Sequence, residues 1–143
     1  MAEQLSAFVP FRDKYVPDGG GDTWASTYMD VLRTLNELGE FATITDGVIF
    51  HNTLASSDYG FLKHGTFEPR PNYFAVLPWQ TLMGTTVYNS KIDIQEGAHV
   101  FCHSRKDGKD GCVYLVINNS LENATTEAGT FAIAPGSCAF FVL

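Results

Sequence analysis

Acidic side chains are the first candidates for chemistry in this chain, which contains 16 aspartate and glutamate residues. Two carboxylates that face one bond can act as the acid and as the nucleophile or base, as in the cleavage of glycosidic bonds. Most of these acids fall on expected helix faces or turns, where carboxylates are simply solvated. Asp58 and Glu68 lie near a loop after an expected strand, but Glu68 precedes Pro69 and is more typical of a helix start. We therefore expect no complete catalytic pair.

A second group of reactive residues consists of His99, Cys102, His103 and Cys112, and its composition suggests a metal site. Alternate residues of a strand face opposite sides, so Cys102 would point away from both histidines. The chain offers no second pair of closely spaced cysteines that could complete a zinc site. We therefore expect no metal ion and no cofactor, with the cysteines in the core and the histidines on the surface.

Two polar segments could bind a small ligand that carries an anionic group or hydroxyls. Gly19, Gly20 and Gly21 precede an expected helix, whose first backbone N–H groups can hold an anion. Asn52 and Tyr59 flank the loop after the expected strand, where an amide can bond sugar hydroxyls and a phenol can donate to a carboxylate. From the residues alone, the alternatives are favoured: a flexible glycine linker, an asparagine that orders the loop and a tyrosine that packs.

The elements that would position these residues begin with a helix over residues 23–40. Its apolar residues recur at three- and four-residue steps, and Gly39 is its expected stop. The apolar run 48–50 predicts a buried strand, which leads into the polar loop. The order of strand, loop and helix is typical of a parallel α/β unit.

A second helix is expected after the loop. Pro69 and Pro71 open it, because proline is favourable in the first helical turn. The apolar residues continue to Gly84, which is the expected stop. Pro78 lies inside this helix and predicts a kink.

The pattern changes to short strands in the last part of the chain. Residues 100–104 and 113–118 predict two strands of a hairpin, because the segment 106–111 between them carries Asp-Gly turn signals. Residues 130–134 and 138–143 predict two further strands. The chain is therefore expected to be mixed α/β, of the α+β class.

Two regions are expected, a partial barrel-like α/β segment over residues 1–86 and an antiparallel β-domain over residues 87–143. The 143 residues are too few for a complete (β/α)₈ barrel, which takes about 250 residues. Hydrophobic residues make up 45% of the chain and charged residues 17%, which favours a folded domain over disorder.

Several of these segments resemble glycoside hydrolase family 79, which contains heparanases and β-glucuronidases. The triple glycine and the helix after it, with Leu-Asn-Glu-Leu-Gly at 35–39, resemble the segment that follows the family's nucleophile strand. Residues 48–60 resemble its last barrel strand and loop, and residues 67–85 resemble its last barrel helix. The final residues, 140–143, resemble the closing strand of its accessory β-domain.

The resemblance implies the last βα units of a (β/α)₈ barrel followed by a small antiparallel β-sandwich-like domain. It also implies a retaining mechanism with two glutamates, which are not found here. The nucleophile strand should precede the triple glycine, but Pro17 and Asp18 lead directly into Gly19. The triple glycine and Tyr59 resemble positions that hold the carboxylate of the sugar, and Asn52 lies near a polar substrate contact.

The sequence therefore predicts a truncated β-glucuronidase-like hydrolase that is inactive alone and binds an acidic carbohydrate such as a glucuronide. The alternative is a non-catalytic module that binds carbohydrate or protein, or that assembles into homo-oligomers. The net charge of −7 disfavours nucleic acid and anionic membranes as partners. We find no secretory signal and no apolar run of membrane-spanning length, and the three cysteines slightly favour the cytoplasm.

Overall fold

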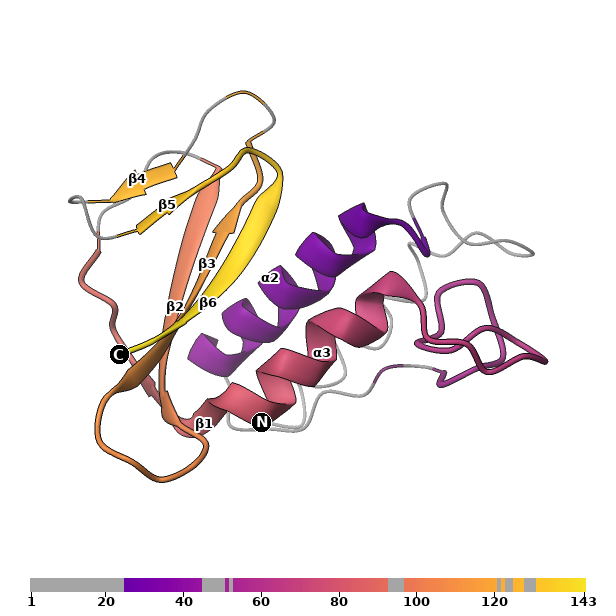
Figure 1. Ribbon diagram of the computed structural model, residues 1–143, viewed down its shortest axis with the longest axis horizontal. Coiled ribbons are helices and arrows are strands. Elements are labelled where there is room, and N and C mark those ends of the chain that lie inside the picture. The colour runs from indigo at the N-terminus through magenta and orange to yellow at the C-terminus, as the bar shows by residue number, and fades with distance from the viewer. Residues whose placement is uncertain are drawn as a thin grey trace.

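The computed structural model describes residues 25–44, 51, 53–92, 97–120, 122, 125–127 and 131–143. Within these ranges, two helices cover one face of a four-stranded antiparallel sheet, and a two-stranded pair lies against the other face (Figure 1). The elements in chain order are α2 (Tyr28–Ile44), α3 (Pro71–Leu82), β1 (Met83–Tyr88), β2 (Ala98–Arg105), β3 (Cys112–Asn118), β4 (Thr125–Glu127), β5 (Phe131–Ile133) and β6 (Ser137–Val142). The predicted α+β class is confirmed.

The main sheet has the strand order β1-β2-β3-β6, and each neighbouring pair is antiparallel. The predicted hairpin of 100–104 and 113–118 is confirmed as β2 and β3, in which Cys102 lies opposite Tyr114. Strands β1 and β4 were not predicted. Strand β1 starts at Met83, directly after α3, so the prediction that this helix continues to Gly84 is wrong.

The helix face of the sheet, from which Phe101, Val113, Leu115 and Ile117 project, packs against α2 and α3. The side chains of Leu115 and Ile117 are fully buried. They contact a core that also contains apolar residues of both helices, namely Val31, Leu32, Leu35 and Ala75. In Figure 1 the two helices run side by side in the same direction, and their N-terminal ends lie on the side away from the sheet.

Gly39 lies inside α2, which continues to Ile44, so the prediction that Gly39 ends the helix is wrong. A Cβ atom at this position would lie 2.4 Å from ring atoms of Phe101. The glycine is therefore needed for the close approach of α2 to β2, rather than for a helix stop.

The outer face of the sheet has a smaller core, formed with the β4–β5 pair. Its buried residues are Val116, Phe131 and Ile133. The ring of Phe131 contacts those of Tyr114 and Phe141, at centroid distances of 5.4 and 4.5 Å. The described chain thus has three layers: helices, main sheet and strand pair.

The predicted boundary between residues 86 and 87 falls within β1. That strand pairs with β2, and the helices share one core with the sheet. The division into two domains stays a prediction. The predicted strand at 48–50 lies outside the described residues. Neither described helix has the length and apolar character needed to cross a membrane.

Candidate functional site

The candidate site is the loop over residues 53–70, which connects toward α3 and lies at the N-terminal ends of both helices (Figure 1). Backbone hydrogen bonds close the loop on itself. The N–H of Leu62 donates to the carbonyl of Leu54 at 2.8 Å, and that of Arg70 donates to Phe61 at 2.9 Å. These bonds, with the bridge between Leu62 and Pro69, give the loop a defined shape.

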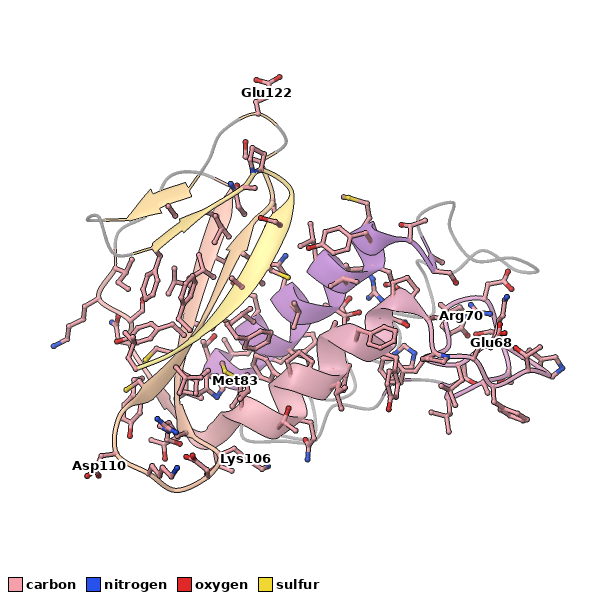
Figure 2. The ribbon with its side chains drawn as sticks, in the orientation of Figure 1. Glu68, Arg70, Met83, Lys106, Asp110 and Glu122 are labelled. Atoms are coloured by element: carbon pink, nitrogen blue, oxygen red, sulfur yellow. The ribbon has the colours of Figure 1, made fainter. Side chains whose placement is uncertain are left out.

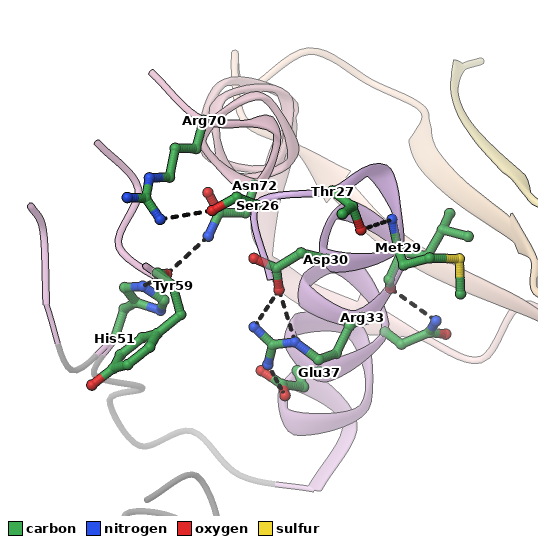
Figure 3. Close-up of polar contacts among 12 residues, drawn as sticks. Ser26, Thr27, Met29, Asp30, Arg33, Glu37, His51, Tyr59, Arg70 and Asn72 are labelled. Atoms are coloured by element: carbon green, nitrogen blue, oxygen red, sulfur yellow. Dashed lines mark hydrogen bonds and ion pairs between the residues drawn. The ribbon is translucent and has the colours of Figure 1, made fainter. Parts of the chain in front are cut away.

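Tyr59 is held in this loop through its backbone. Its carbonyl oxygen accepts a hydrogen bond from Nδ2 of Asn72 at 3.2 Å and another from Nε2 of His51 at 3.0 Å. Asn72 is fully buried in the first turn of α3, and the His51 ring stacks on Phe61 at a centroid distance of 3.9 Å. Figure 3 shows the Tyr59 ring directed away from Asn72, and the ring meets His51 edge-on at a centroid distance of 6.4 Å.

Arg70 joins the loop to the start of α2. Its guanidinium donates to Oγ of Ser26 at 2.7 Å, and that hydroxyl donates to the carbonyl oxygen of Asp58 at 2.5 Å (Figure 3). Arg70 is also the residue directly before α3. Its positive charge and the N-terminal ends of two helices together favour an anionic group at this end of the molecule.

The carboxylates near this site are held by basic partners. Asp30 is fully buried and accepts hydrogen bonds from Nε and Nη2 of Arg33, at 2.9 and 2.6 Å. Glu37 binds the same guanidinium. Glu68 is exposed and forms an ion pair with Lys63 at 3.1 Å.

Glu68 and two other acidic residues are spread over the surface of the described chain. Figure 2 shows Glu68 beside the loop, Asp110 at the turn after β2 and Glu122 beyond β3, at three separate corners of the molecule. These three carboxylates are therefore too far apart to face one bond.

Of the predicted site residues, the structure describes Tyr59 alone. Gly19, Gly20, Gly21 and Asn52 lie outside the described residues, and their roles stay predictions.

The residues that anchor Tyr59 were not predicted. For Asn72 a signal was present, because a buried amide in the first turn of a proline-opened helix is well placed to bond the preceding loop. His51 and Ser26 gave no such signal.

The cysteine and histidine predictions for β2 have mixed outcomes. Cys102 is buried, as predicted, but His103 is only 3% exposed, so its predicted surface position is wrong. It faces the helices, 5.1 Å from the Trp79 ring, and its Nδ1 donates to the carbonyl of Gly84 at 2.9 Å. Burial lowers the pKa of His103. Within the described ranges, no three His, Cys, Asp or Glu residues converge as metal ligands would.

A cavity of about 540 Å³ lies between α2, α3 and β6. Apolar side chains line it, among them Val31, Leu35, Phe74 and Phe140. Sugars need polar partners for their hydroxyls, and Tyr59 is not among its lining residues. The cavity therefore does not include Tyr59, although Pro69 of the same loop lines it.

Comparison with curated proteins connects the chain to enzymes that act on glucuronides. It is 34% identical over 109 residues to heparanase-like protein 1 of Arabidopsis thaliana, and 30% identical over 107 residues to baicalin-beta-D-glucuronidase of Scutellaria baicalensis. The chain is a homologue of the heparanase-like glycoside hydrolases, family 79. The resemblance on which the sequence prediction rested is thereby confirmed. No family model matches the chain.

The heparanase-like matches cover most of this chain but a small part of each relative. The two alignments include 76% and 75% of the chain, and 20% of each relative. A shorter match, 32% identical over 69 residues, links the chain to a hyaluronoglucuronidase of Hirudo nipponia. The chain thus spans about a fifth of the length of these first curated relatives.

Proposed function

We propose that the chain contributes one wall of a glucuronide-binding site in a heparanase-like fold, and that it does not cleave glycosides by itself. In this proposal, α2, α3 and the loop before α3 belong to the last βα units of a (β/α)₈ barrel. The strands belong to a small antiparallel β-sandwich-like domain. The homology to glucuronidases and heparanase-like proteins supports an acidic carbohydrate as the ligand.

The observation that carries the proposal is the anchoring of Tyr59. A fully buried amide, that of Asn72, fixes the Tyr59 carbonyl, and the half-buried phenol is directed away from Asn72 on the loop that also carries Arg70. A phenol O–H can donate to a sugar carboxylate. The Arg70 guanidinium on the same loop adds a positive charge that attracts an anion at longer range. A hydrogen bond to a charged group contributes about 1.5–3 kcal/mol.

The state of three described carboxylates supports the proposed lack of hydrolysis. A retaining glycosidase needs two carboxyl groups about 5–5.5 Å apart across the scissile bond, one of them available as a nucleophile. Asp30 and Glu37 are bound to Arg33, and Glu68 is bound to Lys63. These ion pairs support structural roles for Asp30, Glu37 and Glu68.

Binding of glucuronate and of glucose, measured by NMR titration, tests the proposed site. The two sugars differ in the carboxylate, so we expect glucuronate to bind more tightly than glucose. Replacement Tyr59→Phe should weaken glucuronate binding by about tenfold, because one charge-assisted hydrogen bond is lost. Tyr88→Phe is the matched control, because Tyr88 is an exposed tyrosine of β1. Equal binding of both sugars, or an unaltered affinity in Tyr59→Phe, contradicts the proposal.

Turnover of an aryl β-glucuronide tests the proposed lack of catalysis separately. We expect no release of the aryl group by the purified chain. Turnover that disappears in Glu68→Gln, but persists in Glu122→Gln, would show that a described carboxylate is catalytic. That result would overturn this part of the proposal and leave the binding site intact.

A second candidate function is self-assembly through α3. The side chains of Phe74 and Leu77 are 55% and 47% exposed, and Tyr73 beside them is 36% exposed. Clustered exposed apolar side chains are typical of interaction surfaces. Light scattering should then show a dimer or larger species, and Phe74→Asp should shift it to a monomer. A monomer at all concentrations would rule this candidate out.

A further inference from the structure

Ser26, which lies just before α2, is bonded to two residues far along the chain. Its hydroxyl accepts a hydrogen bond from the Arg70 guanidinium at 2.7 Å and donates one to the carbonyl oxygen of Asp58 at 2.5 Å. Both partners belong to the loop over residues 53–70, which carries Tyr59. Figure 3 shows the Arg70 side chain directed toward Ser26. A single hydroxyl thus uses its proton and a lone pair to tie this loop to the start of α2.

The backbone of Ser26 has an unfavourable conformation. Its φ angle is 64°, in the left-handed region, where a Cβ atom crowds the backbone and glycine is favoured. The first turn of α2 is capped by another residue, because Oγ1 of Thr27 accepts a hydrogen bond from the N–H of Met29 at 3.3 Å. Strained residues of this kind cluster at sites where function needs a fixed geometry. The strain at Ser26 therefore accompanies its contacts with the loop rather than a capping role.

The tie from Ser26 complements the bonds that hold Tyr59. The carbonyl of Tyr59 is bonded to Asn72, in the first turn of α3, and to His51. The carbonyl of the preceding residue, Asp58, is bonded to Ser26. Two consecutive carbonyl groups are thus held from the starts of two different helices, and the loop is fixed relative to both.

We propose that Ser26 is a positioning residue of the glucuronide site, whose hydroxyl fixes the loop of Tyr59 and Arg70 before the sugar binds. This inference rests on the proposed function, because it requires that the loop binds the sugar carboxylate. A loop that is already ordered loses less conformational freedom on binding, so the ligand is bound more tightly. Ser26 acts through the loop and has no contact with the sugar in this proposal.

Three replacements of Ser26 separate its hydroxyl from its backbone conformation. Asparagine tolerates the left-handed region, and its amide can accept a hydrogen bond from Arg70 and donate one to the Asp58 carbonyl. Ser26→Asn should therefore bind glucuronate as the unaltered chain does. Ser26→Ala and Ser26→Gly remove both bonds, and each should weaken glucuronate binding by about three- to tenfold in an NMR titration.

Thermal unfolding distinguishes positioning from a general structural role. Glycine relieves the strain at this position and alanine does not, so the Tm of Ser26→Gly should exceed that of Ser26→Ala by about 3–6 °C. Both variants should nevertheless bind glucuronate equally weakly. Binding by Ser26→Gly that is clearly tighter than binding by Ser26→Ala would overturn the proposal, because affinity would then follow stability. An unaltered affinity in both variants would overturn it as well.

A matched control removes a serine hydroxyl elsewhere in the chain. The hydroxyl of Ser104 in β2 accepts a hydrogen bond from the N–H of Thr86 at 3.3 Å. Ser104→Ala should leave glucuronate binding unaltered. An equal loss of binding in Ser104→Ala would mean that the effect of Ser26 is not specific to the loop.

Hydrogen exchange without sugar separates a failure of this inference from a failure of the proposed function. The amides of Leu62 and Arg70 are bonded within the loop, and they should exchange faster in Ser26→Ala and Ser26→Gly than in the unaltered chain, relative to amides of β3. If exchange is unchanged while the unaltered chain binds glucuronate, the positioning role alone is wrong. Faster exchange in a chain that binds no glucuronate would show the tie itself but refute the glucuronide site, and this inference with it.

Discussion

The two faces of the main sheet are made by the same strands but supported very differently. In β3, Leu115 points toward the helices and its neighbour Val116 points toward β5, and both are fully buried. The helix face is covered by helices of 17 and 12 residues. The outer face is covered by two strands of three residues each. Leu115 and Val116 are therefore equally buried, but the elements that cover them differ in size.

This difference determines which face of the sheet can rearrange when a core side chain is removed. A two-stranded pair is marginally stable alone, so it can move to fill a gap beneath it. Two packed helices that share a core with the sheet have less freedom to do so, because each also packs against the other. The helix face should thus determine the stability of the sheet. The outer face, which is covered by the short β4–β5 pair, should tolerate local movement.

The largest expected effect comes from shortening a core side chain on the helix face of the sheet. Leu115→Ala should reduce the free energy of unfolding by about 3 kcal/mol, because a cavity remains that the helices cannot close. Val116→Ala should cost about 1–2 kcal/mol, since fewer atoms are removed and the β4–β5 pair can settle onto the sheet. Urea denaturation of both variants measures the two losses. Equal losses, or a larger loss at Val116, would mean that the faces are equally well supported.

A smaller effect is expected where the helix face is most tightly packed. Gly39→Ala should destabilise the chain by about 1–3 kcal/mol, because the new methyl would overlap the Phe101 ring. In an unconstrained helix interior the same change would stabilise by about 1 kcal/mol, so the sign of the effect is diagnostic. Adding Phe101→Leu to Gly39→Ala should recover part of the loss, as a double-mutant cycle would measure. A stabilised Gly39→Ala would show that α2 can move away from the sheet.

The sequence was sufficient for elements whose pattern is local. The three- and four-residue apolar spacing of α2, and the strand–turn–strand pattern of β2 and β3, follow from their own residues. Strand β1 was missed because it follows α3 without a turn signal, so Met83 reads as the end of the helix. The glycine inside α2 was misread for a related reason. Its role depends on Phe101, which lies far along the chain and contacts it only in the fold.

The candidate site shows the same limit. Tyr59 was predicted because its loop resembles a family segment. Asn72 and His51 hold that tyrosine from 13 and 8 residues away, and Ser26 contacts Arg70 across 44 residues. No periodicity or motif encodes such contacts, since they arise from the way the loop folds over the ends of two helices. The sequence therefore identified Tyr59 and missed the residues that hold its loop in place.

The smallest expected effect is a pH dependence of the unfolding free energy, which arises from the buried side chain of His103. Burial lowers the pKa of His103 below the ordinary value of 6.5, so the unfolded chain binds more protons than the folded chain in mildly acidic solution. Stability should be fully present above pH 6.5 and decline as the pH falls toward the lowered pKa, by no more than about 1.4 kcal/mol per pH unit. His103→Asn removes the titration and can keep the bond to Gly84, so its unfolding free energy should depend less on pH. An equally steep pH dependence in His103→Asn would contradict a buried, neutral His103.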